Sequence, residues 1–87
     1  MQPILPSHIV RSLAGHDRGR LYHVLRMEGE YAFLADGKIR QMKNPKRKKV
    51  KHLAYAGQNV SPVTDREIRE SLAAFKAGRE FEYRGGR

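Results

Sequence analysis

The chain has 87 residues, no cysteine and a formal net charge of +9. A chain of this length supports one small core, and without cysteine it has neither a disulfide framework nor a cysteine-based zinc site. It holds no apolar run of the roughly 20 residues needed to span a bilayer, and its start lacks the charged region of a signal peptide. We therefore expect one small cytoplasmic domain with no membrane partner.

Three short strands joined by tight turns are predicted first. Residues 7–13, 20–27 and 31–35 are rich in branched and aromatic side chains and are bounded by turn residues. Gly15 and Gly19 flank three polar residues, and glycine adopts a positive φ without a Cβ clash. We expect the segment between them to be a tight, exposed loop.

The middle of the chain predicts a hairpin and a fifth strand. The pair Asp36-Gly37 is typical of a two-residue type I′ turn, which would return the chain as a strand over 38–42. Asn44-Pro45 would end that strand, and residues 50–55 offer the fifth. Five short strands favour a small closed barrel over an open sheet, because closure removes exposed edges.

A helix is predicted at the end of the chain. Thr64 and Glu67 have the spacing of a capping box, and Ile68, Leu72 and Phe75 fall on one helical face. We expect this helix to end near Gly78 and to pack on the barrel. The expected organisation is a barrel that includes the basic residues (1–56), a linker (57–63), the helix (64–78) and a tail (79–87).

Nearly all of the net charge lies in one stretch, residues 38–52, which we call the basic segment. It holds eight lysine or arginine side chains and no carboxylate, and the wider stretch 37–63 supplies +8 of the net charge. Such a concentration attracts phosphate, so nucleic acid is the first candidate partner. A merely solvated run is disfavoured because like charges repel one another, and a lipid surface is disfavoured because no Phe or Trp is interleaved.

Two stretches resemble a known family. The first, IVRSLAGHDRGRLYHVL, is similar to the KOW motif, with Gly15 and the Arg18-Gly19 pair between two strands. The second, FLADGKIRQMKNPKRKKVKHL, resembles small KOW proteins related to ribosomal proteins of archaea and eukaryotes. The resemblance covers residues 7–53. It implies a mainly β fold, an SH3-like barrel of about five strands, that binds ribosomal RNA.

The resemblance also implies where RNA would be held. The first loop would bring backbone N–H groups and Arg18 close to phosphate oxygens, and the basic segment would extend that surface beyond the barrel. The expected nucleic-acid-binding residues are Gly15, His16, Asp17, Arg18, Gly19 and Arg20 in the loop, and Lys38, Arg40, Lys43, Lys46, Arg47, Lys48, Lys49, Lys51 and His52 in the basic segment.

Aromatic side chains raise the question of base stacking. Tyr31 and Phe33 alternate along one predicted strand, which more often indicates core packing, and Tyr22 is placed similarly. Tyr55, next to the basic segment, is the candidate for an exposed stacking surface. With few stacking candidates, we expect contacts mainly to phosphate and sugar and little sequence preference.

Catalysis is not expected. The four histidines, His8, His16, His23 and His52, lack the spacing of metal ligands, and no nucleophile elbow or phosphate-binding Gly-Lys-Ser/Thr loop is present in the sequence. We expect no cofactor and no metal.

The sequence therefore predicts a non-catalytic, monomeric RNA-binding protein associated with ribosomal RNA or the large ribosomal subunit. Its helix could contact ribosomal proteins. On this view, alanine at Arg47, Lys48 and Lys49 together would weaken RNA binding without unfolding the domain. A transcription-associated KOW factor, an SH3-like protein-interaction module and a duplex DNA binder are the alternatives.

Overall fold

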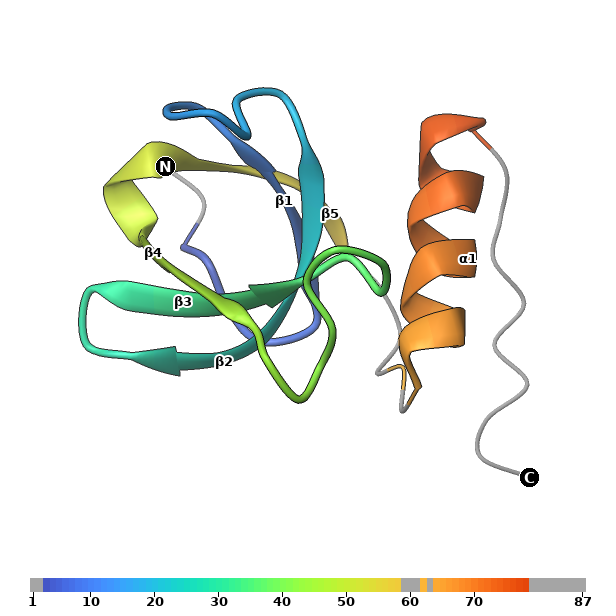
Figure 1. The fold of residues 1–87 in the computed structure, drawn as a ribbon. Coiled ribbons are helices and arrows are strands. Elements are labelled where there is room, and N and C mark those ends of the chain that lie inside the picture. Colours follow the sequence, from blue (N-terminus) through green and yellow to red (C-terminus); the bar gives the residue numbers. More distant parts are fainter. Residues whose placement is uncertain (1–2, 59–61, 63, 79–87) are drawn as a thin grey trace.

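The computed structural model describes residues 3–58, 62 and 64–78. Its five strands form one antiparallel sheet in the order β4-β3-β2-β1-β5, and one helix follows (Figure 1). The mainly β fold class with a C-terminal helix is therefore confirmed. The elements are β1 (His8–Ser12), β2 (Leu21–Glu28), β3 (Tyr31–Ala35), β4 (Lys46–Lys49), the short 3-10 helix η1 (Val50–His52), β5 (Leu53–Gln58) and α1 (Asp65–Lys76).

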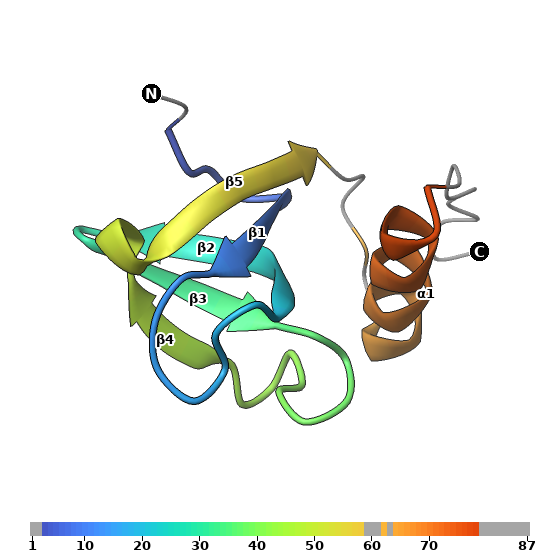
Figure 2. The same cartoon turned by 90° about the horizontal axis from the view of Figure 1, so that it is seen from above.

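The sheet has two edge strands, β4 and β5. Within the described ranges, β4 pairs only with β3 and β5 pairs only with β1. The sheet is strongly curved, as the view from above shows (Figure 2). It does not close on itself, so a closed barrel stays a prediction.

The fourth strand was predicted in the wrong place. Residues 38–42 belong to a loop, and the strand that pairs with β3 is Lys46–Lys49. Asp36 explains the difference, because its Oδ1 accepts the backbone N–H groups of Lys38 and Arg40, each at 2.9 Å. An aspartate that satisfies nearby N–H groups competes with strand pairing, so Asp36-Gly37 opens a longer loop instead of a two-residue turn.

The fifth strand also differs from its prediction. Val50–His52 form the 3-10 helix η1, and β5 begins at Leu53 and continues to Gln58. The strand thereby includes the first two residues of the predicted linker. The main cause is the pairing with β1, which holds Gly57 and Gln58 opposite Ile9 and His8.

Two apolar clusters hold the molecule together. The first packs on the concave side of the sheet and is built from Ile4, Val10, Tyr22, Val24, Ala32, Leu34 and Leu53. The second lies between the sheet and α1 and is built from Ile9, Leu21, Ala35, Ile68 and Leu72. Because strand side chains alternate between the two faces, the apolar residues are divided between an inner core and the surface on which α1 packs.

Helix α1 begins and packs as predicted. The Thr64 hydroxyl accepts the backbone N–H of Glu67 at 3.1 Å, which caps the first turn. Ile68 and Leu72 are buried against the sheet. In Figure 1 the helix stands along one side of the sheet.

The loop between β3 and β4 also fastens α1 to the sheet. Asp65 accepts the backbone N–H of Met42 at 2.8 Å, and Arg69 donates to the carbonyl oxygen of Gly37 at 2.9 Å. Gly37 is buried, has a φ of +82°, and approaches the helix so closely that a Cβ atom there would meet the Asp65 carbonyl oxygen and the Arg69 Cγ, the latter at 2.8 Å. Only glycine fits this joint.

Alanine at Gly37 is therefore expected to destabilise the protein more than alanine at Gly29. Gly29 also has a positive φ, +57°, but a Cβ there would meet nothing within 4 Å. Both variants carry the backbone strain, and only Gly37→Ala adds the collision with α1, for which we expect a further loss of about 1–3 kcal/mol. Urea unfolding of the two variants measures the difference. Equal losses would contradict the tight joint.

Candidate nucleic-acid interface

The direction of each cation in β4 follows from its pairing with β3. Side chains of paired residues lie on the same face of a sheet. The pairs are Lys46 with Leu34, Arg47 with Phe33, Lys48 with Ala32, and Lys49 with Tyr31. Because Ala32 and Leu34 belong to the inner core, Lys46 and Lys48 lie on the core side. Arg47 and Lys49 lie on the outer side.

The two inward lysines meet a buried carboxylate. Lys46 Nζ lies 3.0 Å from Asp17 Oδ2, and Lys48 Nζ lies 3.0 Å from Asp17 Oδ1. The hydroxyl groups of Ser12 and Tyr22 donate to the same carboxylate at 2.8 and 2.9 Å. Asp17 is 6% exposed, so four donors compensate one charge that has left water.

This arrangement sets the protonation of the cluster. Burial alone would raise the pKa of the Asp17 carboxyl, but hydrogen bonds from Lys48 and Lys46, then from the two hydroxyls, outweigh it and hold the pKa well below its usual 3.8. Burial and the hydrogen bond to Asp17 raise the pKa of Tyr22 to about 12. At neutral pH Asp17 is therefore a carboxylate and Tyr22 a neutral phenol.

The cluster also fixes the loop between β1 and β2. Lys48 Nζ donates to the carbonyl oxygen of Ala14 at 2.8 Å as well as to Asp17. Arg11 donates to the carbonyl oxygen of Gly19 at 2.9 Å. Gly15 and Gly19 have φ values of +88° and +89°, the left-handed region that the turn requires. The Lys48 side chain therefore links this loop to β4.

These contacts correct part of the predicted site. The loop was predicted to be exposed throughout, and this is wrong for Asp17, which is buried beneath it. Lys46 and Lys48 were predicted to face RNA, but their ammonium groups are engaged with Asp17, and the Lys48 side chain is only 12% exposed. The physical reason is the twofold alternation of a strand, which sends every second residue of a charged run toward the core.

The outer side of β4 forms a different surface. The Arg47 guanidinium lies 4.3 Å from the centre of the Tyr31 ring, and Lys49 Nζ lies 5.9 Å from the same ring. On the neighbouring strand pair, the Arg26 guanidinium lies 4.0 Å from the centre of the Phe33 ring. We call Arg26, Tyr31, Phe33, Arg47 and Lys49 the outer-face patch.

The patch also corrects the interpretation of two aromatics. Tyr31 and Phe33 were predicted to be core residues, but both are half-buried and lie on the outer face under cations. The core positions of β3 are taken by Ala32 and Leu34, so the odd-numbered side chains face outward. Tyr22 is buried, as predicted.

The remaining predicted residues are spread over three places. Arg18, Arg20 and His16 are exposed on the loop between β1 and β2. Lys38 and Lys43 are exposed on the loop before β4, where Arg40 is half-buried. Lys51 is exposed and His52 half-buried on η1. Lys48 reaches the loop between β1 and β2 from the core side of β4, whereas the outer-face patch lies on the other side of that strand.

Tyr55, the expected stacking residue, lies on the opposite edge strand from β4. Tyr55 is 37% exposed, and its ring packs edge-on against His8, with ring centres 4.8 Å apart. A stacking surface at Tyr55 would therefore be separate from the outer-face patch.

Sequence reasoning missed Arg11 and Arg26 and the roles of Tyr31 and Phe33. The available signal was the two-residue spacing of Arg47 and Lys49 and of Tyr31 and Phe33. The spacing places the two cations opposite the two rings only if residues 46–49, KRKK, form a strand paired with residues 31–34. Asp17 had no such signal, because its lysine partners follow it by 29 and 31 positions.

Where the structure describes the chain, no three His, Asp or Glu side chains gather as metal ligands. His8 and His23 are buried, and burial lowers the pKa of His23 to about 4. No helix in the described part is long and apolar enough to cross a bilayer.

No model of a known protein family matches the chain, and no curated protein matches it.

Proposed function

We propose that this protein is a non-catalytic RNA-binding module that binds RNA through the outer-face patch and the loop between β1 and β2. The observation that carries the proposal is the stacking of Arg26, Arg47 and Lys49 over Tyr31 and Phe33. Such a surface offers phosphate a row of cations and offers unpaired bases a flat aromatic or guanidinium plane.

The distribution of charge supports the same surface. Arg47 and Lys49 stand on an edge strand, so their ammonium and guanidinium groups are open to a ligand on one side. Arg18 is exposed on the loop between β1 and β2, to which Lys48 donates at the Ala14 carbonyl oxygen. Lys46 and Lys48 position this loop and take no phosphate themselves.

The expected contacts are mainly to phosphate and sugar. A patch of three cations and two rings provides few directional groups for reading base edges. The RNA is then recognised by its shape and by stacking of unpaired bases, and affinity depends strongly on salt.

The cellular partner we propose is ribosomal RNA or another ribosome-associated RNA, with the protein in the cytoplasm. This step rests on the resemblance to KOW proteins over residues 7–53. The five-stranded antiparallel sheet is compatible with it. The outer side of α1, where Arg66 pairs with Glu70 at 3.1 Å, is the surface that would meet a ribosomal protein.

Salt dependence tests the mechanism directly. Contact with about six phosphates predicts a slope of log K against log salt of roughly −4 to −5 for a stem-loop RNA. Fluorescence anisotropy at four salt concentrations measures it, with duplex DNA of the same length as competitor. A slope shallower than about −2 would contradict phosphate binding, and stronger binding to the duplex would reassign the partner to DNA.

Sedimentation tests the cellular assignment. A lysate of the source cells is run on a sucrose gradient at physiological salt and again after a high-salt wash. The protein is expected with the large ribosomal subunit before the wash and at the top after it. A protein found only at the top of both gradients would refute ribosome association.

A further inference from the structure

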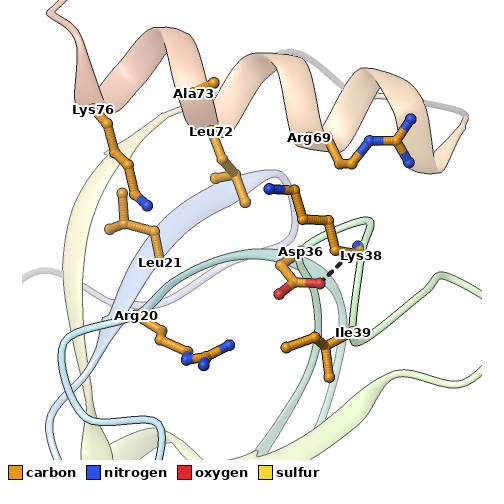
Figure 3. A pocket seen from close by; sticks show the side chains of 9 residues that line it. All are labelled: Arg20, Leu21, Asp36, Lys38, Ile39, Arg69, Leu72, Ala73 and Lys76. Atoms are coloured by element: carbon orange, nitrogen blue, oxygen red, sulfur yellow. Dashed lines mark hydrogen bonds between the residues drawn. The ribbon is translucent and has the colours of Figure 1, made fainter.

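A second cationic site lies between α1 and the loop that precedes β4. A cavity of about 390 Å³ opens between α1 and this loop (Figure 3). Its floor is apolar and includes Leu21 and Leu72, and its walls carry Arg20, Lys38 and Lys76 together with Asp36. The volume is in the range that holds a small ligand.

The cations around this cavity are available to a ligand. Arg20, Lys38 and Lys76 are exposed, and none of them forms an ion pair with another described residue. They come from three separate places: the end of the loop before β2, the loop before β4 and the last turn of α1. Figure 3 shows the Lys38 and Lys76 side chains extending over the apolar floor. Three positive charges around one cavity favour an anionic ligand such as a phosphate group.

The rim of the cavity is held in place. Arg69 is a lining residue, but it donates to the carbonyl oxygen of Gly37 and so fixes the loop to the helix. The Oδ1 atom of Asp36 accepts the N–H groups of Lys38 and Arg40. The site therefore has its shape before a ligand binds.

The Asp36 carboxylate restricts the kind of anion that the cavity can bind. Its Oδ1 is occupied by two N–H groups, and among the described residues no donor meets Oδ2. A carboxylate oxygen in a cationic cavity needs a ligand that brings a hydrogen-bond donor as well as a negative charge. An ionised acidic side chain supplies the charge without that donor. A ribonucleotide supplies both, because its 2′-hydroxyl donates.

We propose that this cavity holds one ribonucleotide unit of the bound RNA. Arg20, Lys38 and Lys76 take the phosphate, and Asp36 Oδ2 accepts the ribose hydroxyl. The sugar and base edge pack on Leu72 and on Ile39, which is 69% exposed at the rim. The assignment rests on the proposed function, and it adds a second contact that distinguishes RNA from DNA.

The probe is adenosine 5′-monophosphate, compared with its 2′-deoxy form and with inorganic phosphate. Amide NMR spectra of the whole protein report binding through Lys38, Arg40 and Leu72. We expect shifts confined to the cavity and a dissociation constant about tenfold lower for the ribonucleotide than for the deoxynucleotide, from one hydrogen bond to a charged group.

Two variants test the residues. Ala73→Glu puts a carboxylate on the exposed cavity wall and is expected to abolish nucleotide binding. Ala77→Glu makes the same change at an exposed position that does not line the cavity and is its control. Asp36→Asn keeps an oxygen for the loop N–H groups, and it is expected to retain phosphate binding while losing the preference for ribose.

The outcomes separate this site from the outer-face patch. Equal affinity for ribo- and deoxynucleotide, or no loss in Ala73→Glu, would overturn the ribonucleotide assignment, as would tighter binding of an acidic peptide. If the mononucleotide does not bind but the stem-loop RNA does, the cavity proposal fails and the proposed function stands. If the mononucleotide binds and the stem-loop RNA does not, the proposed function fails at the outer-face patch.

Discussion

Replacing Asp17 with asparagine is expected to lower the free energy of unfolding by about 3–5 kcal/mol. The substitution leaves Lys46 and Lys48 beside an uncharged amide, with Lys48 almost fully buried. Breaking a buried ion pair by removing one partner costs far more than the pair itself contributes, because the remaining charge stays out of water. The asparagine amide would also place two N–H donors beside Lys46, Lys48, Ser12 and Tyr22, which all donate to Asp17.

Urea unfolding at pH 7 measures this loss, and Glu28→Gln is the matched control. Glu28 pairs with Arg26 at 3.4 Å on the exposed surface, where removing the charge is expected to cost less than about 1 kcal/mol. Similar losses in the two variants would show that Asp17 does not organise the fold.

The pH dependence of the same variant has a defined sign. The pKa of Asp17 in the folded protein lies below its ordinary 3.8, so below that pH the unfolded chain binds the proton more readily. The stabilisation is complete above about pH 4 and is lost as the pH falls further, through the folded pKa. Wild type should therefore lose more stability than Asp17→Asn between pH 5 and 2. Parallel losses would contradict the depressed pKa.

Removing Arg47 and Lys49 together is expected to weaken RNA binding about tenfold to hundredfold and to make the salt slope shallower by about two. Each is an outward cation of the outer-face patch, and each covers Tyr31. The loss of stability should stay near 1 kcal/mol, because cation–π contacts at exposed sites contribute about 0.5–1 kcal/mol each. Anisotropy with the stem-loop RNA measures the change.

The single variants Arg47→Ala and Arg66→Ala form a matched pair that separates the patch from the total charge. Both remove one exposed guanidinium, and Arg66 lies on α1, away from the outer-face patch. Equal effects on RNA affinity would mean that total charge, and not the patch, holds the RNA.

The triple variant suggested by the sequence mixes two effects. Alanine at Arg47 and Lys49 removes outward cations, whereas alanine at Lys48 removes a partner of Asp17 and the bond to the Ala14 carbonyl oxygen. We therefore expect the triple variant to lose stability as well as affinity. This expectation differs from the one drawn from the sequence alone, in which the triple variant leaves the fold intact.

Local signals in the sequence located much of the fold. The strands β1, β2 and β3 and the cap of α1 follow from branched residues, glycine turns and the Thr64–Glu67 pair, all of which act within a few residues. β4 was not found, because lysine and arginine have little intrinsic preference for strands and KRKK reads as a charged loop. Its pairing with β3 overrides that preference.

The candidate site was less accessible to sequence reasoning. The basic segment identified the right region of the chain, but it treated its cations as equivalent. Which of them face outward depends on strand register, and the burial of Asp17 depends on contacts across about thirty residues. Neither is encoded in a local pattern.

The sequestration of Lys46 and Lys48 has a consequence for measurements by ligand-induced thermal stabilisation. Folding hides two ammonium groups that the unfolded chain exposes, so a polyanion meets more free cations on the unfolded chain than on the folded domain. A ligand that also binds the unfolded state raises the melting temperature by less than its affinity for the native state would give. Melting shifts in the presence of nucleic acid will therefore understate how tightly the folded protein binds it.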